Sequence, residues 1–216
     1  KKVRSDDAYS PGGKGFRRPD RAVIVYSNKI REAYGDIPIA IGGLEASLRR
    51  FAHYDYWDDA VRRSILIDSQ ADLLMYGMGE RQIIEIAKRT HKGQSMKEMD
   101  GIRGTCVVRN CAPPASSDVA YCDSFEKVKS DKRSYARSFK VQSDEHDPVR
   151  GRTLVQKHGG SFLIQYPPQP PLTTQEMDMV YALPYERKYH PSYEAQGGVP
   201  AIEEVEFSIT ANRGCF

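Results

Sequence analysis

The sequence has few cysteines, little net charge and no long apolar segment. Its 216 residues include only four cysteines at uneven spacings, so we expect no disulfide framework. We find no run of about 18 apolar residues and no positively charged, apolar signal segment, and we therefore expect a soluble, cytoplasmic protein without a membrane partner. The net charge of +3 is too small to argue for nucleic acid, and that partner stays undecided.

Positive charge is concentrated at a few places. Four cations between Lys14 and Arg21 flank a stretch rich in glycine and proline, and arginine pairs follow at 49–50 and 62–63. Such clusters can bind phosphate groups, although a solvated basic face is the more common outcome.

Two short buried strands are each followed by a glycine turn and a helix. Residues 37–41 and 72–76 have the apolar character of buried strands. The helices that follow begin near Leu44 and near Glu80, and an earlier helical pattern covers residues 22–33. This repeated order is typical of α/β proteins, so we expect a partial Rossmann-like parallel sheet with helices.

The glycines of these turns, Gly42, Gly43, Gly77 and Gly79, are candidate cofactor-binding positions. Ligands of such sheets bind beyond the carboxyl ends of the strands, and glycine lets the backbone approach a ligand at a helix N-terminus. The pattern Gly77-x-Gly79-x-x-Gln82 lacks the third glycine of a dinucleotide fingerprint, and the glutamate after Gly79 would repel a phosphate. Tight turns that let helices pack closely are the alternative interpretation.

Local signals predict further elements before residue 110. Asp59 can cap a helix in which Val61 and Ile65 lie one turn apart. Residues 65–67 could form a strand, but we favour a helix there. Residues 105–108 are expected to form a strand.

After residue 122 the composition becomes more polar. Residues 123–145 predict an exposed, partly packed helix, and 153–158 resemble a helix end capped by two glycines. Residues 161–166 predict a strand. Thr173 and Glu176 form a capping box at the start of another helix.

The last segment combines a strand pattern with a cysteine. Val205, Phe207 and Ile209 alternate with polar residues, which predicts a strand with one buried face over residues 205–210. Cys215 would then lie near its carboxyl end, where a thiol can point into a cofactor site. A free thiol is the alternative. The expected organisation is a Rossmann-like domain, a linker, a mixed α+β connecting region and this last segment, at 1–110, 111–122, 123–204 and 205–216.

Longer stretches of the sequence resemble one family, the YgiQ-type (UPF0313) radical S-adenosylmethionine (SAM) proteins. The resemblance lies in the segment called their N-terminal domain. The matching stretches cover nearly all of the chain. They include Gly42-Gly43-Leu44-Glu45-Ala46-Ser47-Leu48-Arg49-Arg50, Ala52-His53-Tyr54-Asp55-Tyr56-Trp57, Gly77-Met78-Gly79-Glu80, His190-Pro191-Ser192-Tyr193 and Arg213-Gly214-Cys215-Phe216.

The resemblance implies a Rossmann-like domain, similar to cobalamin-binding modules, followed by the first strand of a catalytic barrel. It also implies that Cys215 is the first of three ligands of a [4Fe-4S] cluster in a Cys-x-x-x-Cys-x-x-Cys motif. Earlier strands of the domain and the other two cysteines are expected outside this chain. Cobalamin itself is not expected, because the Asp-x-His-x-x-Gly signature of its cobalt ligand is absent.

The family chemistry implies an enzyme that reductively cleaves SAM to a 5′-deoxyadenosyl radical. An electron donor such as flavodoxin or ferredoxin is then implied. One thiolate cannot hold such a cluster, so this chain alone is expected to be inactive. The resemblance supplies no substrate.

Three rival interpretations come from other residues. Cys106, Cys111 and Cys122 with His91 or His146 could bind a metal, but their spacings match no common site. The cluster from His53 to Trp57 could form a substrate or partner surface or do acid-base work, although aromatic packing at a helix end is the more common outcome. The whole chain could also be a non-catalytic α/β module that binds RNA or a protein.

Overall fold

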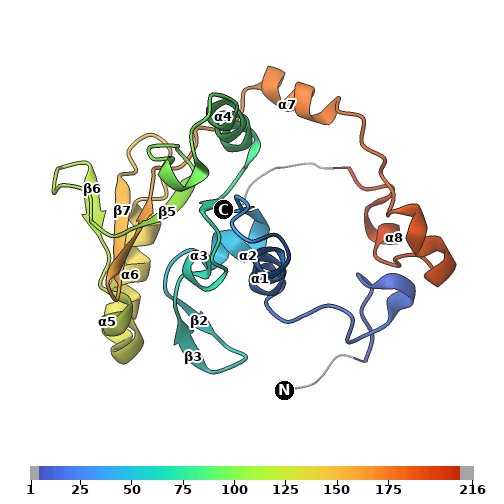
Figure 1. Ribbon diagram of the computed structural model, residues 1–216, viewed down its shortest axis with the longest axis horizontal. Coiled ribbons are helices and arrows are strands. Elements are labelled where there is room, and N and C mark those ends of the chain that lie inside the picture. Colours follow the sequence, from blue (N-terminus) through green and yellow to red (C-terminus); the bar gives the residue numbers. More distant parts are fainter. Residues whose placement is uncertain (1–4, 210–216) are drawn as a thin grey trace. The chain divides into compact units, whose positions relative to one another are not determined.

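The computed structural model describes residues 5–209, which form two compact units (Figure 1). The larger unit comprises residues 21–171, and the smaller unit combines residues 5–20 with 172–209. Within residues 5–209 no helix has the length and apolar character needed to cross a membrane.

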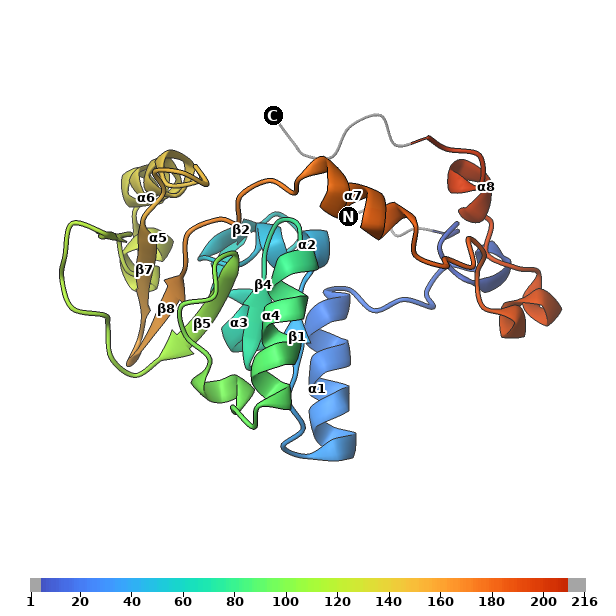
Figure 2. The same ribbon diagram turned by 90° about the horizontal axis from the view of Figure 1, so that it is seen from above.

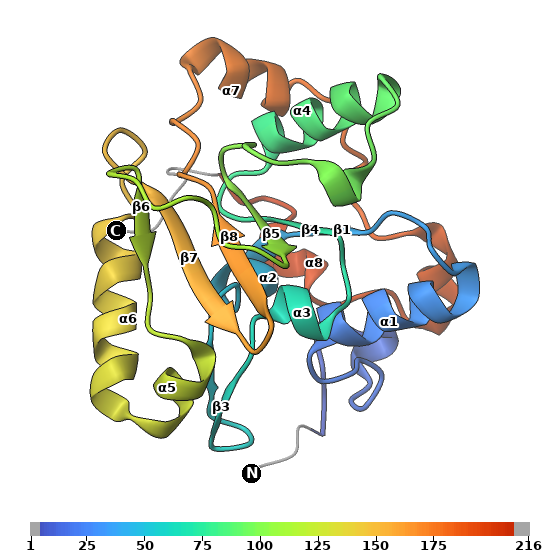
Figure 3. The ribbon, with the colours of Figure 1, turned by 60° about the vertical axis from the view of Figure 1, so that its left-hand side comes forward.

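A six-stranded sheet forms the centre of the larger unit (Figure 3), in the order β1-β4-β5-β8-β7-β6. Its strands are β1 (Ala40–Ile41), β4 (Leu73–Met75), β5 (Thr105–Arg109), β6 (Val119–Tyr121), β7 (Thr153–His158) and β8 (Ser161–Gln165). Strand β1 pairs with β4, and β6 with β7, in parallel, whereas the three pairs between them are antiparallel. The predicted α/β class is confirmed, and the arrangement is consistent with a Rossmann-like fold.

Helices cover both faces of this sheet. They are α1 (Ala22–Tyr34), α2 (Gly43–Leu48), α3 (Ile65–Asp68), α4 (Glu80–His91), α5 (Phe125–Ser130) and α6 (Lys132–Asp144). Figure 2 shows α5 and α6 beside β7 and, at the other end of the sheet, α1 and α4 beside β1 and β4. The strands are therefore enclosed by helices, which explains their apolar sequences.

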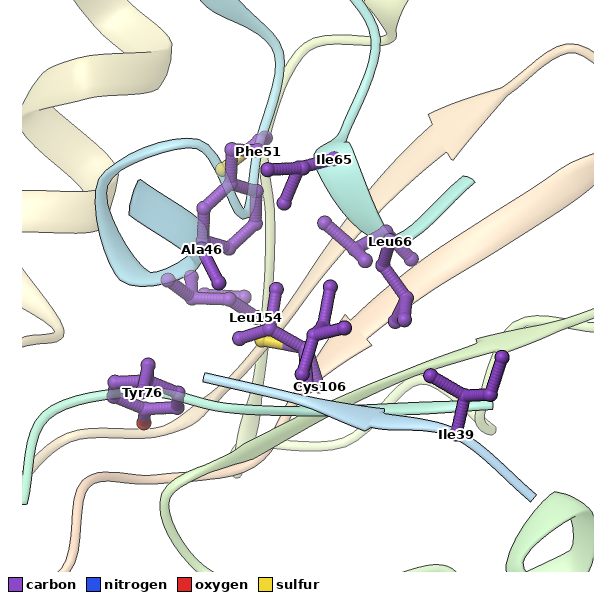
Figure 4. Close-up of a cluster of buried hydrophobic side chains, with 13 residues drawn as sticks. Ile39, Ala46, Phe51, Ile65, Leu66, Tyr76, Cys106 and Leu154 are labelled. Carbon is purple, nitrogen blue, oxygen red and sulfur yellow. The ribbon is translucent and has the colours of Figure 1, made fainter. Parts of the chain in front are cut away.

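Two apolar cores lie on opposite faces of the sheet because successive strand residues alternate between the faces. The first core contains Leu74, Cys106, Leu154 and Leu163, with Ala46, Phe51, Ile65 and Leu66 packed over them (Figure 4). The second core contains Leu73, Val107, Val155 and Ile164, with Ile86 of α4 and Met99 after the 3-10 helix η2 (Met96–Glu98).

Most of the predicted helices and strands are present. The helical pattern at 22–33 is α1, and the favoured helix at 65–67 is α3. The polar stretch 123–145 forms α5 and α6, separated by Asp131, whose carboxylate accepts hydrogen bonds from the amides of Arg133 and Ser134. In the smaller unit the capping box of Thr173 and Glu176 begins α7 (Thr174–Tyr181) as predicted.

The helix predicted to begin at Asp59 is wrong. Residues 53–62 form a hairpin of β2 (His53–Asp55) and β3 (Ala60–Arg62), with Asp59 in its turn at a φ of 49°. The Tyr54 hydroxyl donates to the Asp59 carboxylate, which holds that side chain in the turn. The next helix, α3, starts only after Ser64, whose hydroxyl accepts a hydrogen bond from the amide of Leu66.

The helix end predicted at 153–158 is also wrong, because this segment is β7. It pairs with β6 on one side and β8 on the other, and Gly159-Gly160 forms the hairpin turn into β8 instead of a helix cap. The expected linker, residues 111–122, contributes β6 to the same sheet. Long-range pairing with two neighbouring strands therefore overrides the local signals.

The segment 205–210 was predicted as a strand, and its described part is not one. Helix α8 (Ile202–Val205) ends where the strand should begin, and residues 206–209 form a turn and an irregular stretch. Val205, Phe207 and Ile209 are exposed. No strand within residues 5–209 pairs with this segment, and a strand without a partner has no ladder of hydrogen bonds to stabilise it.

The segment that follows α2 crosses the first-core face of the sheet and is held there by a buried glutamine. Gln156 of β7 is fully buried, and its Oε1 accepts a hydrogen bond from the amide of Ala52 at 2.8 Å. Its Nε2 donates to the carbonyl of Asp123, and its Oε1 lies 3.0 Å from His158 Nε2. The same amide thus connects β7, the start of α5 and the segment after α2.

His158 should make the fold sensitive to acid. The residue is only 6 % exposed, its ring stacks on Phe125, and its Nδ1 has no hydrogen-bond partner among residues 5–209. Burial lowers the pKa of His158 from 6.5 to about 4. Between pH 6.5 and 4, His158 is protonated in the unfolded chain but stays neutral in the folded chain. The free energy of unfolding therefore falls as the pH falls toward 4.

We therefore expect His158→Asn to flatten the pH dependence of unfolding. This residue alone should account for a loss on the order of 3 kcal/mol as the pH falls through that window, measured by urea denaturation at a series of pH values. His91→Asn is the matched control, because His91 is exposed at the end of α4. An unchanged slope in His158→Asn would contradict the assignment.

Candidate functional site

The four predicted glycines lie together at one edge of the sheet. Gly42 and Gly43 connect β1 to α2, while Gly77 and Gly79 connect β4 to α4. Because β1 and β4 are adjacent and parallel, both turns lie at their carboxyl ends. A Cβ on Gly42 would lie 3.4 Å from the carbonyl oxygen of Met75, at the end of β4. The structure therefore brings the candidate positions side by side.

The chain leaves these two strands toward opposite faces of the sheet (Figure 3). Ala46 of α2 packs in the first core, whereas Ile86 of α4 packs in the second core. In open α/β sheets, ligands bind outside the carboxyl ends of strands at such a point of divergence. The topology therefore gives this edge a physical reason to be a binding site.

The turns themselves are open. Gly43 and Gly77 have φ values of 78° and 70°, which glycine adopts without strain. A Cβ added at Gly43, Gly77 or Gly79 would meet no atom within 4 Å among the described residues. The amide of Gly77 donates to the hydroxyl of Ser47 in α2 at 3.4 Å, so a hydrogen bond joins the two turns.

Gln82 occupies the place of the missing third glycine. Its side chain is fully buried, and Nε2 donates to the carbonyls of Tyr76 at 3.2 Å and Gly104 at 3.5 Å. Gln82 thus connects helix α4 to Tyr76, just after β4, and to Gly104, just before β5. This buried amide replaces the close helix packing that a glycine would allow, which accounts for the departure from a dinucleotide fingerprint.

Next to the turns lies an arginine that pairs with no carboxylate of residues 5–209. Arg50 is half-buried, donates through Nε to Gln165 Oε1 at 2.5 Å and through Nη1 to the carbonyl of Ser47. Its guanidinium lies 4.9 Å from the centre of the Tyr76 ring. Tyr76 is buried and its hydroxyl donates to the carbonyl of Tyr166 at 2.5 Å.

A second arginine at this edge is also bound only by neutral groups. Arg103 donates to the carbonyls of Pro148 and Pro168. None of the ion pairs within residues 5–209 includes Arg50 or Arg103. Burial raises the pKa of Tyr76, and the positive charges of Arg50 and Arg103 both lower it. Arg50 and Arg103 thus bring two positive charges close to Tyr76.

Sequence analysis noted the Arg49-Arg50 pair but missed Tyr76, Gln82 and Gln165 as parts of this site. A signal for Gln165 was present, because a glutamine that continues the alternation of an apolar strand must be buried on one face. Buried amides need partners. Its partner could be found only from the structure.

The described cysteines do not fit a metal cluster. Burial raises the pKa of Cys106 to about 12 and that of Cys122 to about 11, so both remain protonated thiols, whereas metal ligation requires thiolates. Cys111 is exposed. Within residues 5–209 no three His, Cys, Asp or Glu side chains are grouped to hold a metal, so the rival site of these cysteines with His91 or His146 is not formed there. Cys215 lies outside the described residues.

The cluster from His53 to Trp57 lies on the β2–β3 hairpin, not at a helix end. Asp55 is buried and pairs with Arg21 at 2.5 Å, and Arg21 also pairs with Asp58. His53 Nδ1 instead lies 3.1 Å from the carbonyl of Phe51. His53 and Asp55 thus use their polar atoms separately, which argues against an acid-base pair.

The smaller unit contains a pocket lined by part of the predicted basic cluster. The 3-10 helices η1 (Pro11–Gly13) and η3 (Pro191–Gln196) contact each other, and the amide of Gly12 donates to the carbonyl of Gly198 at 2.8 Å. A pocket of about 230 Å³ is lined by Pro11, Lys14, Arg17 and Gln196. Its two cations are exposed side chains.

Comparison with known proteins identifies the family. The model described as Radical SAM N-terminal matches residues 1–208. The chain belongs to this radical SAM N-terminal family. The resemblance to the UPF0313 proteins is confirmed as well. The UPF0313 protein of Clostridium botulinum (strain 657 / Type Ba4) is 58% identical over 216 residues, which cover 100% of this chain and 34% of the relative.

A second relative gives the same result. The UPF0313 protein of Clostridium perfringens (strain 13 / Type A) is 55% identical over 215 residues, covering 100% of this chain and 32% of the relative. The chain thus spans about a third of the length of the curated relatives that it matches. No solved structure matches this chain.

The glycines of this radical SAM N-terminal domain should differ in their tolerance of alanine. At Gly104, φ is 76° and a Cβ would lie 2.2 Å from Gln82 Nε2. Gly104→Ala should therefore lower the free energy of unfolding by about 2–4 kcal/mol, through backbone strain and the loss of buried hydrogen bonds. Gly77→Ala should cost only about 1–2 kcal/mol, because strain acts there without a clash.

Gly79→Ala is the matched control, since its φ is −89° and the added Cβ meets nothing within 4 Å. It should change stability by less than about 0.5 kcal/mol. Denaturant unfolding of the three variants tests the order, and equal losses at Gly104 and Gly79 would contradict it.

Proposed function

We propose that this chain is the amino-terminal part of a radical SAM iron-sulfur enzyme, in which the α/β unit is an accessory domain. The match of the radical SAM N-terminal family to residues 1–208 carries the proposal. The relatives are about three times as long as the segment they share with this chain, which leaves room for a catalytic barrel.

Cys215 is the proposed cluster ligand of this chain. It lies in Arg213-Gly214-Cys215-Phe216, wording that resembles the start of the family's Cys-x-x-x-Cys-x-x-Cys loop. The other three cysteines lie outside that motif; Cys106 and Cys122 are buried and Cys111 is exposed. A bound [4Fe-4S] cluster would supply the electron that cleaves SAM to a 5′-deoxyadenosyl radical. Flavodoxin or ferredoxin is the proposed electron donor and the cytoplasm the proposed location.

A non-catalytic binding module is the second candidate function. The open glycine turns and the unpaired Arg50 favour it, because they are features of recognition and not of redox chemistry. The two candidates are compatible if the larger unit recognises a ligand while another part of a longer protein holds the cluster.

The cluster proposal predicts a specific effect of one cysteine. In a protein of the relatives' full length that carries this chain, Cys215→Ala should abolish the absorbance of the anaerobically reconstituted cluster and reduce SAM cleavage at least about a hundredfold, because one of three thiolate ligands is lost. Iron content, the electron paramagnetic resonance signal and 5′-deoxyadenosine formation are the measurements.

Cys111→Ala is the control, since it removes an exposed thiol outside the motif. It should retain the iron and the activity. If Cys215→Ala bound as much iron and cleaved SAM as fast as the unchanged protein, Cys215 would have no place in the mechanism.

A further inference from the structure

Next to the hydrogen bond between Arg50 and Gln165, two nitrogen donors are unused within residues 5–209, Arg50 Nη2 and Gln165 Nε2. Arg50 uses Nε and Nη1, and no hydrogen bond of Nη2 is found with any residue from 5 to 209. Gln165 is fully buried, its Oε1 accepts from Arg50, and its Nε2 has no hydrogen-bond partner in the described part of the chain. Because Oε1 and Nε2 belong to one amide, the unused Nε2 lies beside the guanidinium.

An unsatisfied buried donor and an unpaired cation at one place are both unfavourable. A buried polar group without a hydrogen bond destabilises the fold, and nearly all such groups in native proteins have a partner. A half-buried guanidinium normally pairs with a carboxylate or phosphate, which its fork of donors fits. One acceptor with negative charge would satisfy both groups at once.

No carboxylate among residues 5–209 forms an ion pair with Arg50, although Glu80 directly follows the open turn after β4. Glu45 of α2 pairs with Arg49, and Glu145 at the end of α6 pairs with Arg152. Asp100, near the start of β5, pairs with Arg109 and accepts from the Tyr166 hydroxyl. The charged neighbour that acts on the Tyr76 ring together with Arg50 is another cation, Arg103.

The position in the fold favours a ligand. Arg50 donates to the carbonyl of Ser47, whose hydroxyl accepts from Gly77, so the arginine is connected to the open turn after β4. Tyr76, which directly follows β4, lies with its ring 4.9 Å from the guanidinium and belongs to the same buried cluster as Cys106 and Leu154 (Figure 4). The glycine turns beside it have no side chain of their own and no described atom covering their Cβ positions.

We propose that Arg50 and Gln165 bind an oxyanion, a carboxylate or phosphate group of a small ligand, beside the open turn after β4. The guanidinium supplies charge and Nη2, and the Gln165 amide supplies a second donor. Gly43 and Gly77 let the remainder of the ligand lie against the backbone. This function of the larger unit is independent of Cys215 and of the cluster.

The decisive variant is Gln165→Glu in the full chain. It replaces the Nε2 donor by a carboxylate oxygen beside the guanidinium, neutralises the charge of Arg50 and should leave the fold intact. Inorganic phosphate and acetate are the probes, titrated at constant ionic strength and followed by the NMR signals of the Arg50 Nε–H and the Gln165 side-chain amide. A response to either probe identifies the group, and Gln165→Glu should weaken its binding at least tenfold, followed by the Arg50 signal.

Two controls separate this site from other positive surfaces. Gln70→Glu makes the same change of charge at an exposed position before β4, at the opposite end of that strand from Gly77, and should bind the probe as the unchanged chain does. Arg17→Gln removes a cation of the smaller unit's pocket and should also retain binding. Should Gln165→Glu fail to fold, Gln165→Met removes the donor without adding charge and should weaken binding severalfold.

Three results would overturn the proposal. They are no shift of the Arg50 and Gln165 signals with either probe, unchanged affinity in a folded Gln165 variant, and loss of binding in Arg17→Gln but not in Gln165→Glu. The last result would assign the anion to the pocket of the smaller unit.

Discussion

Two buried glutamines hold the segment after α2 against the sheet, and the first apolar core and the candidate site depend on this attachment. Gln165 binds the side chain of Arg50 and Gln156 binds the amide of Ala52, so Phe51, between them in sequence, is fixed in the first core. A fully buried amide that loses such a partner costs about 1–3 kcal/mol. Gln156 and Gln165 can therefore be buried on the first-core face of the sheet because this segment supplies their hydrogen-bond partners.

The same attachment brings charge to the edge where ligands of α/β sheets bind. If the side chain of Arg50 pointed away from the sheet, water would solvate it and its positive charge would not lie beside the turn after β4. Held by Gln165 and stacked on Tyr76, it stays beside Gly77 without a carboxylate. The hydrogen bond that positions the arginine also leaves the second donor of Gln165 unused. Attachment of the segment and recognition of an anion are thus two consequences of one side chain.

The sequence predicted what depends on local pattern and failed where distant pairing decides. The apolar run and glycine turn at 72–79 identified β4 and the start of α4, because both strand faces are buried and the turn needs a left-handed glycine. The polar end of 153–158 resembled a helix, since nothing local reveals that Gln156 is buried under Ala52. The glycines of the site were predictable as positions. Their grouping with Arg50 and Gln165 required contacts across more than a hundred residues.

The thiols of the larger unit limit what chemistry it can do. Cys106 lies in the same row of the sheet as Gln165 and Leu154, and its burial keeps it protonated. A protonated, enclosed thiol is a poor nucleophile and a poor metal ligand, even with Arg50 nearby to favour the thiolate. Among the described residues at this edge, Arg50 and Gln165 retain unused hydrogen-bond donors and positive charge, and Gln82 retains one unused acceptor, its Oε1. We infer that the larger unit binds and orients a small anionic ligand. Redox chemistry, if Cys215 ligates a cluster, is then carried out elsewhere in the protein.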